Sequence, residues 1–299
     1  MVFGIIAMIL VGMSWIVWGI VAGAAPRRNL DMGLMVAASG VLGGLVSLPI
    51  ALKQGVPDFS VAGHWLILLL VFIGGLFNFG QLQFMSRAMK HGPNGIVWAI
   101  VQCGFICPFI LGVLLFGEPL RWSFMLAVLL VVAALAIYGL AGDNNASGKW
   151  FGFTLLSFLA TCCCQSFQYI PSNLAGVEGV SSVWRTLAFF SGLLGGFFIA
   201  LAFSKEMRGV VAPMLKNKFT WLYTILIVVV EVGACYWLLY PGMDALAKAN
   251  VGAISTQLMT ASSIIIFELY AVLLLKEKRS LLQYIAFACC LLSIAAVCF

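Results

Sequence analysis

Residues Arg87–Glu118 read RAMKHGPNGIVWAIVQCGFICPFILGVLLFGE, and Asp244–Glu277 repeat the pattern as DALAKANVGAISTQLMTASSIIIFELYAVLLLKE. Gly95 in the first copy aligns with Gly252 in the second, and each copy continues as a long apolar segment that ends in glutamate. The second copy is two residues longer between the glycine and the glutamate. A repeat of this kind predicts two related halves of one fold.

The composition around this repeat is that of a membrane protein. Apolar residues make up 63% of the 299 residues and charged residues only 9%, whereas a soluble chain carries about a quarter charged residues. The net charge of +6 is explained by basic residues in the connectors, which fix orientation in a bilayer. We therefore expect the lipid bilayer as a partner and no nucleic acid.

The hydropathy pattern predicts an all-α polytopic protein. Ten apolar spans, each near the length of about 20 residues that a bilayer requires, run over 2–24, 32–52, 65–86, 94–116, 122–140, 150–172, 180–203, 219–240, 250–275 and 280–298. The longest connector, Ser204–Lys218, has 15 residues and leaves no room for a soluble domain. The polar sequence DNNASGK, Asp143–Lys149, separates two five-helix repeats, which we place at 1–142 and 149–299.

The basic residues predict how the chain crosses the membrane. Connectors after the odd-numbered spans hold twelve Lys and Arg residues and the other side holds four. This bias places the odd-numbered connectors in the cytoplasm and both termini outside, in what we expect to be a bacterial inner membrane. Because each half has an odd number of spans, the second half enters from the opposite side, which predicts an inverted repeat and alternating access.

Small residues and one proline are expected to shape the packing of the spans. The runs Gly40–Gly44, Gly74–Gly75 and Gly192–Gly196 let helix backbones approach closely. Pro108 lies inside the fourth span, where it lacks an N–H group and should loosen the helix.

Ionisable residues inside the bilayer are candidates for ion or proton coupling, because a central charge costs about 2.5–3.5 kcal/mol on insertion scales. Glu231 lies in the middle of IVVVEVGACYW, and it has two interpretations, a coupling carboxylate or a structural hydrogen bond to a neighbouring helix. Glu268 lies nearer the end of its span, where a packed or water-facing carboxylate is the favoured interpretation. Arg185 begins the seventh span, where it either snorkels to the interface or approaches Glu231.

Amide and aromatic side chains within the spans form a second set of candidates. Amides beside aromatic rings suit a small polar solute, with hydrogen bonds to its edge and stacking on its face. For a single amide, a hydrogen bond between helices is the favoured interpretation; for the whole set, we predict a binding cavity. The predicted substrate-binding residues are Trp15, Asn78, Gln81, Trp98, Gln102, Gln165, Gln168, Tyr169, Trp237 and Gln257, with Trp18 and Tyr236 as further aromatic residues inside the spans.

The sequence contains no motif of an enzyme or of a nucleotide-binding protein. HExxH, GxSxG, a Walker loop and CxxC pairs are all missing. The nine cysteines lie in apolar spans, where they are expected to act as small apolar residues. We therefore predict no catalytic residues, no metal and no cofactor.

The segments LLFGEPLRW, Leu114–Trp122, and LLLKEKRS, Leu273–Ser280, resemble those of the drug/metabolite transporter superfamily in its ten-helix, two-repeat EamA-type form. The second segment departs from the usual Gly-Glu because Lys276 precedes Glu277. The opening spans and NFGQLQFMSRAMKHG, Asn78–Gly92, look more like the branch of glucose, ribose and rhamnose porters. That resemblance implies proton symport of a sugar, whereas many relatives have both termini in the cytoplasm and export amino acids or other metabolites.

Together these observations favour a secondary transporter for a small polar metabolite, sugar-like or amino-acid-like, with its site between spans 1, 3, 4, 6, 8 and 9. We expect a small-molecule substrate, and the arrangement leaves open a homodimer. The alternatives are a lipid-linked flippase component or a non-transporting partner subunit. A membrane-embedded enzyme lacks any catalytic constellation.

Overall fold

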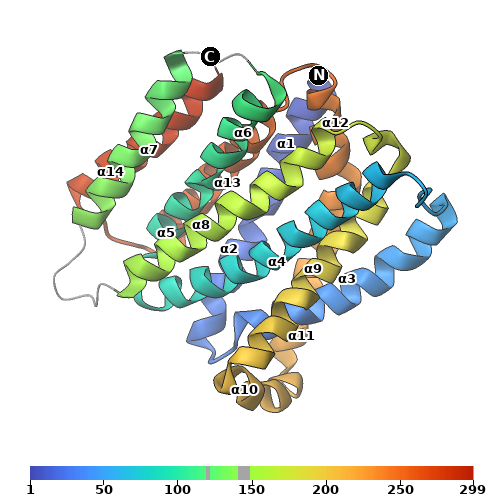
Figure 1. The fold of residues 1–299 in the computed structure, drawn as a ribbon. Coiled ribbons are helices and arrows are strands. Elements are labelled where there is room, and N and C mark those ends of the chain that lie inside the picture. Colours follow the sequence, from blue (N-terminus) through green and yellow to red (C-terminus); the bar gives the residue numbers. More distant parts are fainter. Residues whose placement is uncertain (119–121, 141–148, 299) are drawn as a thin grey trace.

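The computed structural model describes residues 1–118, 122–140 and 149–298. Within these residues the protein is a bundle of helices, without strands (Figure 1). The α-helices of the first half are α1 (Val2–Ser14), α2 (Ile16–Arg27), α3 (Met32–Gln54), α4 (Ala62–His91), α5 (Asn94–Gln102), α6 (Ile106–Phe116) and α7 (Trp122–Leu140). Those of the second half are α8 (Lys149–Tyr169), α9 (Ser182–Phe203), α10 (Lys205–Leu215), α11 (Lys218–Ala234), α12 (Tyr240–Ala247), α13 (Ile254–Leu273) and α14 (Leu281–Cys298).

Most of these helices have the length and composition of membrane spans. In the described residues, eight helical segments are long and apolar enough to cross a bilayer, and α7 and α14 contribute the shorter apolar helices Met125–Ala134 and Leu281–Ser293. The prediction of an all-helical integral membrane protein is thus confirmed. The polar segment Asp143–Lys149 lies outside the described residues except for Lys149, which begins α8.

Three of the spans are interrupted near their middle. One residue, Trp15, separates α1 from α2; a 3-10 turn, Cys103–Phe105, separates α5 from α6; and a π-helical turn, Cys235–Leu239, separates α11 from α12. The 3-10 turn precedes Pro108, which has no N–H to donate to the carbonyl of Gly104 four residues earlier. The predicted loosening at Pro108 is therefore confirmed.

The glycine runs bring helices into close contact, as predicted. A Cβ atom built on Gly75 of α4 would lie 2.9 Å from the Cα atom of Gly192 in α9, so the two backbones touch at this point. The Gly40–Gly44 run of α3 faces Phe190 and Leu194 of α9. Helix α9 is thereby held between α3 and α4, while α7 and α14 lie side by side at one edge of the molecule (Figure 1).

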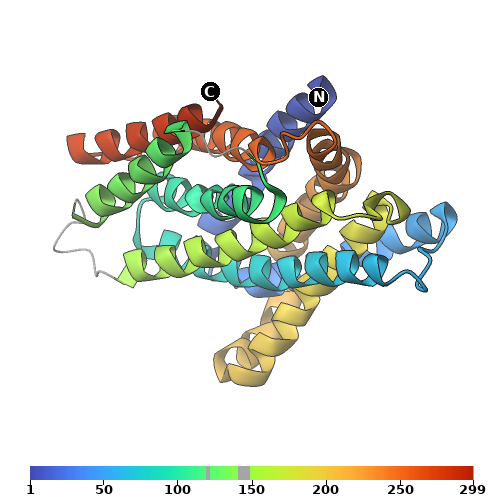
Figure 2. The same cartoon turned by 45° about the horizontal axis from the view of Figure 1, so that its top comes forward.

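One helix, α10, was not predicted from the sequence. It occupies the connector Ser204–Lys218, begins with the Ser204 hydroxyl accepting a hydrogen bond from the N–H of Met207, and lies at the end of the bundle between α9 and α11 (Figures 1 and 2). Its buried residues Met207 and Met214 pack on the core, where the sulfur atoms accept hydrogen bonds from Gln83 and from the N–H of Asp31. The connector is thus an ordered part of the fold.

Candidate substrate site

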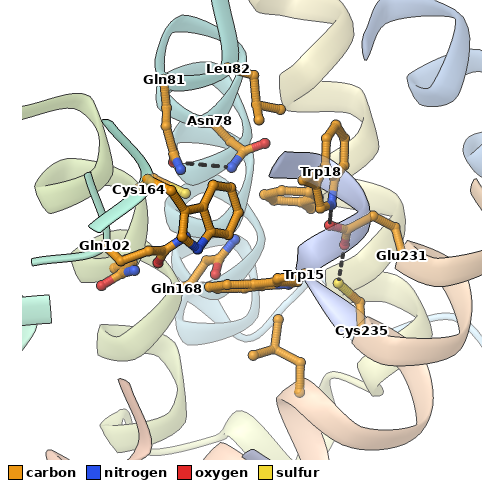
Figure 3. Close-up of a pocket in the computed structure, with 14 residues that line it drawn as sticks. Trp15, Trp18, Asn78, Gln81, Leu82, Gln102, Cys164, Gln168, Glu231 and Cys235 are labelled. Atoms are coloured by element: carbon orange, nitrogen blue, oxygen red, sulfur yellow. Dashed lines mark hydrogen bonds between the residues drawn. The ribbon is translucent and has the colours of Figure 1, made fainter. Parts of the chain in front are cut away.

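The main cavity lies where the three interrupted spans meet α4, α8 and α9. It has 14 lining residues: Trp15, Trp18, Asn78, Gln81, Leu82, Trp98, Gln102, Cys164, Gln165, Gln168, Phe189, Glu231, Cys235 and Leu239 (Figure 3). The space between these side chains amounts to about 440 Å³, but only about 30 Å³ of it is open to the centres of water molecules. A cavity needs about 10–15 Å³ by this measure to hold one water. In the described conformation the cavity therefore has room for two or three waters but not for a metabolite.

Most of the residues predicted to bind substrate line this cavity. Seven of the ten are present, together with Glu231, the first coupling candidate. The structure adds Cys164, Cys235, Trp18 and three apolar residues. Cys235 was missed although it lies four residues after Glu231 and so shares its helix face.

Five polar atoms of the lining have no hydrogen-bond partner among the described residues. They are buried and belong to Trp15 (Nε1), Asn78 (Oδ1), Gln102 (Oε1), Gln165 (Oε1) and Gln168 (Oε1). A buried polar group left unpaired costs about 1–3 kcal/mol, so five of them together are a large cost for a folded protein. Because they face the cavity, these atoms are free to bond water or another polar molecule there.

Glu231 is held by one other span and by the next turn of its own span. The indole Nε1 of Trp18 donates to one carboxylate oxygen, and the Sγ of Cys235 lies 2.8 Å from the other. The side chain of Glu231 is only 4% exposed, and Gln102 and Cys164 face it from the other side of the cavity (Figure 3). Glu231 is the only Asp, Glu, Lys, Arg or His among the lining residues.

The wall of the cavity is supported by a second layer from α13. The indole N–H of Trp98 donates to the hydroxyl of Ser263 at 3.0 Å, and the ring of Trp98 stacks on Phe267 with centroids 4.8 Å apart. Neither residue of α13 is among the lining residues. The ninth span, which was expected to contribute to the site, therefore positions Trp98 from behind, and α9 contributes Phe189 in its place.

Three predicted substrate-binding residues lie away from the cavity. Tyr169 follows Gln168 by one residue and points to the end of the bundle, where its hydroxyl donates to Glu118 at 2.7 Å. Trp237 has a side chain 65% exposed, because six residues after Glu231 correspond to a different helix face. Gln257 is buried with both amide atoms unpaired among the described residues, but it does not line the cavity.

The two other coupling candidates form ion pairs at opposite ends of the bundle. Arg185 does not reach Glu231: its guanidinium makes two hydrogen bonds to the carboxylate of Asp244, at 2.9 and 2.5 Å, and lies over the ring of Tyr240. Glu268 bonds Arg279, whose side chain is fully buried. Both residues have partners of their own, so neither contributes a free charge to the cavity.

The comparisons with known proteins agree with a membrane transporter. Residues 2–140, a little under half of the chain, match the EamA-like transporter family, a family of transporters rather than enzymes. The fold is similar to that of a protein solved by crystallography, with a TM-score of 0.62, 18% sequence identity, and coverage of 97% of this chain and 94% of the other. No match to a curated protein sequence was found.

Proposed function

We propose that this protein is a secondary active transporter that moves a small, polar, uncharged or zwitterionic metabolite by alternating access. The observation that carries the proposal is the set of five unpaired polar atoms around one central cavity. A site built to bond polar groups of a substrate rejects analogues that lack them, because its own buried groups are then left unpaired. The narrow cavity would have to widen to admit such a molecule.

The lining favours a sugar-like substrate over an anionic one. Carboxamides offer both donors and acceptors to hydroxyl groups, and the indoles of Trp15, Trp18 and Trp98 supply flat apolar surfaces for a ring. The lining contains no Lys or Arg that would balance a phosphate or a carboxylate. An amino acid would need its carboxylate held by backbone or amide N–H groups alone.

We assign coupling to Glu231. A carboxylate buried at mid-membrane is costly when ionised, and here its two partners are neutral groups, the Trp18 indole and the Cys235 thiol. Proton uptake at Glu231 removes the charge without breaking an ion pair. Glu268 is already neutralised by Arg279, so we do not assign it this role.

The helix contacts support two inverted five-helix repeats, 1–142 and 149–299. If the two halves are exchanged, the contact of α1 with α13 corresponds to the contact of α8 with α5 and α6. In the same way, the contact of α4 with α8 corresponds to the contact of α12 with α1. Helices α3 and α9 pack on each other, as do α7 and α14. All of these contacts are those that an exchange of the two halves would predict. Both chain ends lie at the same side of the bundle (Figure 1), as an even number of spans requires.

The proposed orientation follows from the distribution of Lys and Arg between the two sides and places both termini outside. Twelve of the sixteen Lys and Arg residues then lie on the cytoplasmic side. A homodimer is compatible with this arrangement, since the exposed apolar faces of α7 and α14 are at the edge of the molecule (Figure 2).

A thermal-shift screen of the purified protein against sugars, amino acids, nucleosides and amines tests the proposal. A ligand that binds only the folded state at 100 times its Kd stabilises by about 2.7 kcal/mol. We expect selective stabilisation by one class of neutral polyol, and saturable uptake of the same compound by proteoliposomes. Gln168→Ala should remove the shift.

Gln257→Ala is the matched control for this experiment. Gln257 is also a buried glutamine with an unpaired amide on a membrane helix, but it lies outside the cavity. The shift should persist in this variant. Loss of the shift in Gln257→Ala but not in Gln168→Ala would place the site elsewhere. A shift with lipids and with no water-soluble compound would favour a flippase component instead.

A further inference from the structure

The two repeated glutamates each bind the start of the repeated helix in the other half. Glu118, at the end of the first copy, accepts hydrogen bonds from the backbone N–H of Ala253 at 3.1 and 3.3 Å, where α13 begins. Glu277, at the end of the second copy, accepts hydrogen bonds from the N–H groups of Asn94 at 2.8 Å and Gly95 at 3.1 Å, where α5 begins. The sequence repeat thus corresponds to a reciprocal pair of contacts between the halves.

The same local geometry places both carboxylates. Gly117 and Lys276 adopt the left-handed conformation with φ of 67° and 53°, and the N–H of each following glutamate donates to the carbonyl six residues earlier, Gly112 or Ala271. A left-handed residue of this kind is typical of helix C-termini. It turns the chain back so that each glutamate reaches across to the other half.

The two contacts close opposite ends of one span. Glu277 binds where the span Asn94–Phe116 begins, and Glu118 follows its end. The 23 residues of this span correspond to about 35 Å at a rise of 1.5 Å per residue. Trp98 and Gln102, which line the cavity, lie between the two ends. The cavity is therefore enclosed between the two glutamate contacts.

Each contact belongs to a larger polar cluster that anchors its glutamate. At one end the hydroxyl of Tyr169 donates to Glu118. At the other end Arg279 lies 3.5 Å from Glu277 and also bonds Glu268. A carboxylate at a helix start is favoured by the helix dipole and the free N–H groups there, yet such a contact has no covalent link and separates when the helix start moves.

We propose that Glu118 and Glu277 are the two latches of the transport cycle, and that opening to either side releases one while the other stays bound. This inference rests on the proposed alternating access and adds the residues that position the halves. Both glutamate contacts are made in the described conformation, and the cavity between them is narrow. Releasing Glu118 should favour the state open at the Ala253 end, and releasing Glu277 the state open at the Asn94 end.

Hydrogen exchange of the full chain in lipid nanodiscs tests this proposal without a substrate. In Glu118→Ala, exchange of peptides that cover Ala253 should accelerate, by about 10- to 100-fold for the loss of a hydrogen bond to a charged acceptor. At the same time exchange around Asn94 and Gly95 should become slower, because the population shifts toward the state that closes that end. Glu277→Ala should give the mirror image.

Hydrogen exchange at the end opposite the substitution is the decisive readout, because a purely local helix cap would change exchange only beside the substitution. Glu178→Ala is the control: this glutamate pairs with Lys248 on the surface, and its side chain is 75% exposed. It should leave both ends unchanged. If an alanine variant fails to fold, Glu118→Gln and Glu277→Gln retain the volume and should shift the two ends in the same directions.

Faster hydrogen exchange only at the end that carries the substitution, or equally faster exchange at both ends, would overturn the proposal that these glutamates are latches. Neither result would contradict the proposed transport, which is measured separately by uptake. Absence of uptake together with the mirrored exchange pattern would overturn the proposed function and leave a two-state membrane bundle with these latches.

Discussion

Replacing Lys276 by glycine should stabilise the protein, although it removes a whole side chain. Lys276 has φ of 53°, a left-handed conformation that costs an L-residue about 1–2 kcal/mol. Glycine adopts this conformation freely but loses about 0.5–1 kcal/mol more backbone entropy on folding. The difference is a gain of about 0.5–1 kcal/mol. Lys276 is exposed, and it makes no ion pair with a described residue, so no contact is lost.

The assay is the melting temperature of Lys276→Gly in detergent micelles, measured beside the unchanged protein. A gain of 1 kcal/mol raises the melting temperature of a soluble domain of 150–250 residues by about 2–4 °C, so we expect about 2 °C here. The bond from Glu277 to the start of α5 should persist, since the turn that directs it becomes less strained.

Gly117→Lys is the reverse substitution at the equivalent position and provides the control. Gly117 has φ of 67°, and a Cβ atom there would have no neighbour within 4 Å. Its cost is therefore conformational alone, a net loss of about 0.5–1 kcal/mol after the smaller backbone entropy of lysine is counted, and the melting temperature should fall. If Lys276→Gly and Gly117→Lys shifted the melting temperature in the same direction, the equivalence of the two helix ends would be refuted.

Three further substitutions test other parts of the structure. Glu231→Gln should abolish accumulation driven by a pH gradient, which for one proton per solute reaches about tenfold per pH unit, while exchange between labelled and unlabelled substrate continues. Asp244→Asn leaves the guanidinium of Arg185 buried at 2% exposure without its partner, and should destabilise by about 3–5 kcal/mol in thermal unfolding. Gly75→Ala forces a Cβ atom against the backbone of Gly192, and overpacking of this kind costs about 1–3 kcal/mol in the same assay.

Each of these has an outcome that contradicts it. Full accumulation by Glu231→Gln would remove its coupling role. Unchanged stability of Asp244→Asn would mean that Arg185 is solvated. For Gly75→Ala the matched control is Gly152→Ala, because Gly152 is also in a helix but has open space around it. That control should gain about 0.5–1 kcal/mol, and an equal loss in both variants would rule out the close helix contact.

The class of protein and much of the site were predictable because both leave local signals. A polar residue in an apolar span is visible without knowledge of its neighbours, and Glu231, Gln102 and Gln168 were recognised in this way. Spacing adds the helix face: Asn78 and Gln81 are three residues apart and line the same cavity. The same spacing rule places Trp237 on a different helix face from Glu231.

Pairings between distant spans were not predictable, because they depend on how each helix is rotated and shifted against the others. The antiparallel order of spans left open whether Arg185 snorkels or approaches Glu231, and Arg185 in fact bonds Asp244, 59 residues away. The reciprocal binding of Glu118 and Glu277 is of the same kind. The repeat made the two segments equivalent, but nothing in it showed that each one reaches the other.

The helix breaks fit the proposed transport, because a cavity with about 30 Å³ open to water centres would have to widen to admit a metabolite. Small-molecule pockets commonly measure about 300–1,000 Å³, so substrate entry requires the walls to move. Helices α3, α4 and α9 are continuous and pack through glycines, which makes them the rigid part. The breaks at Trp15, Cys103–Phe105 and Cys235–Leu239 all lie in spans that line the cavity. A π-helical turn of this type commonly marks a functional site. In the proposed cycle, movement at these three breaks would reshape the cavity around Glu231, while the two proposed latches would determine which side opens.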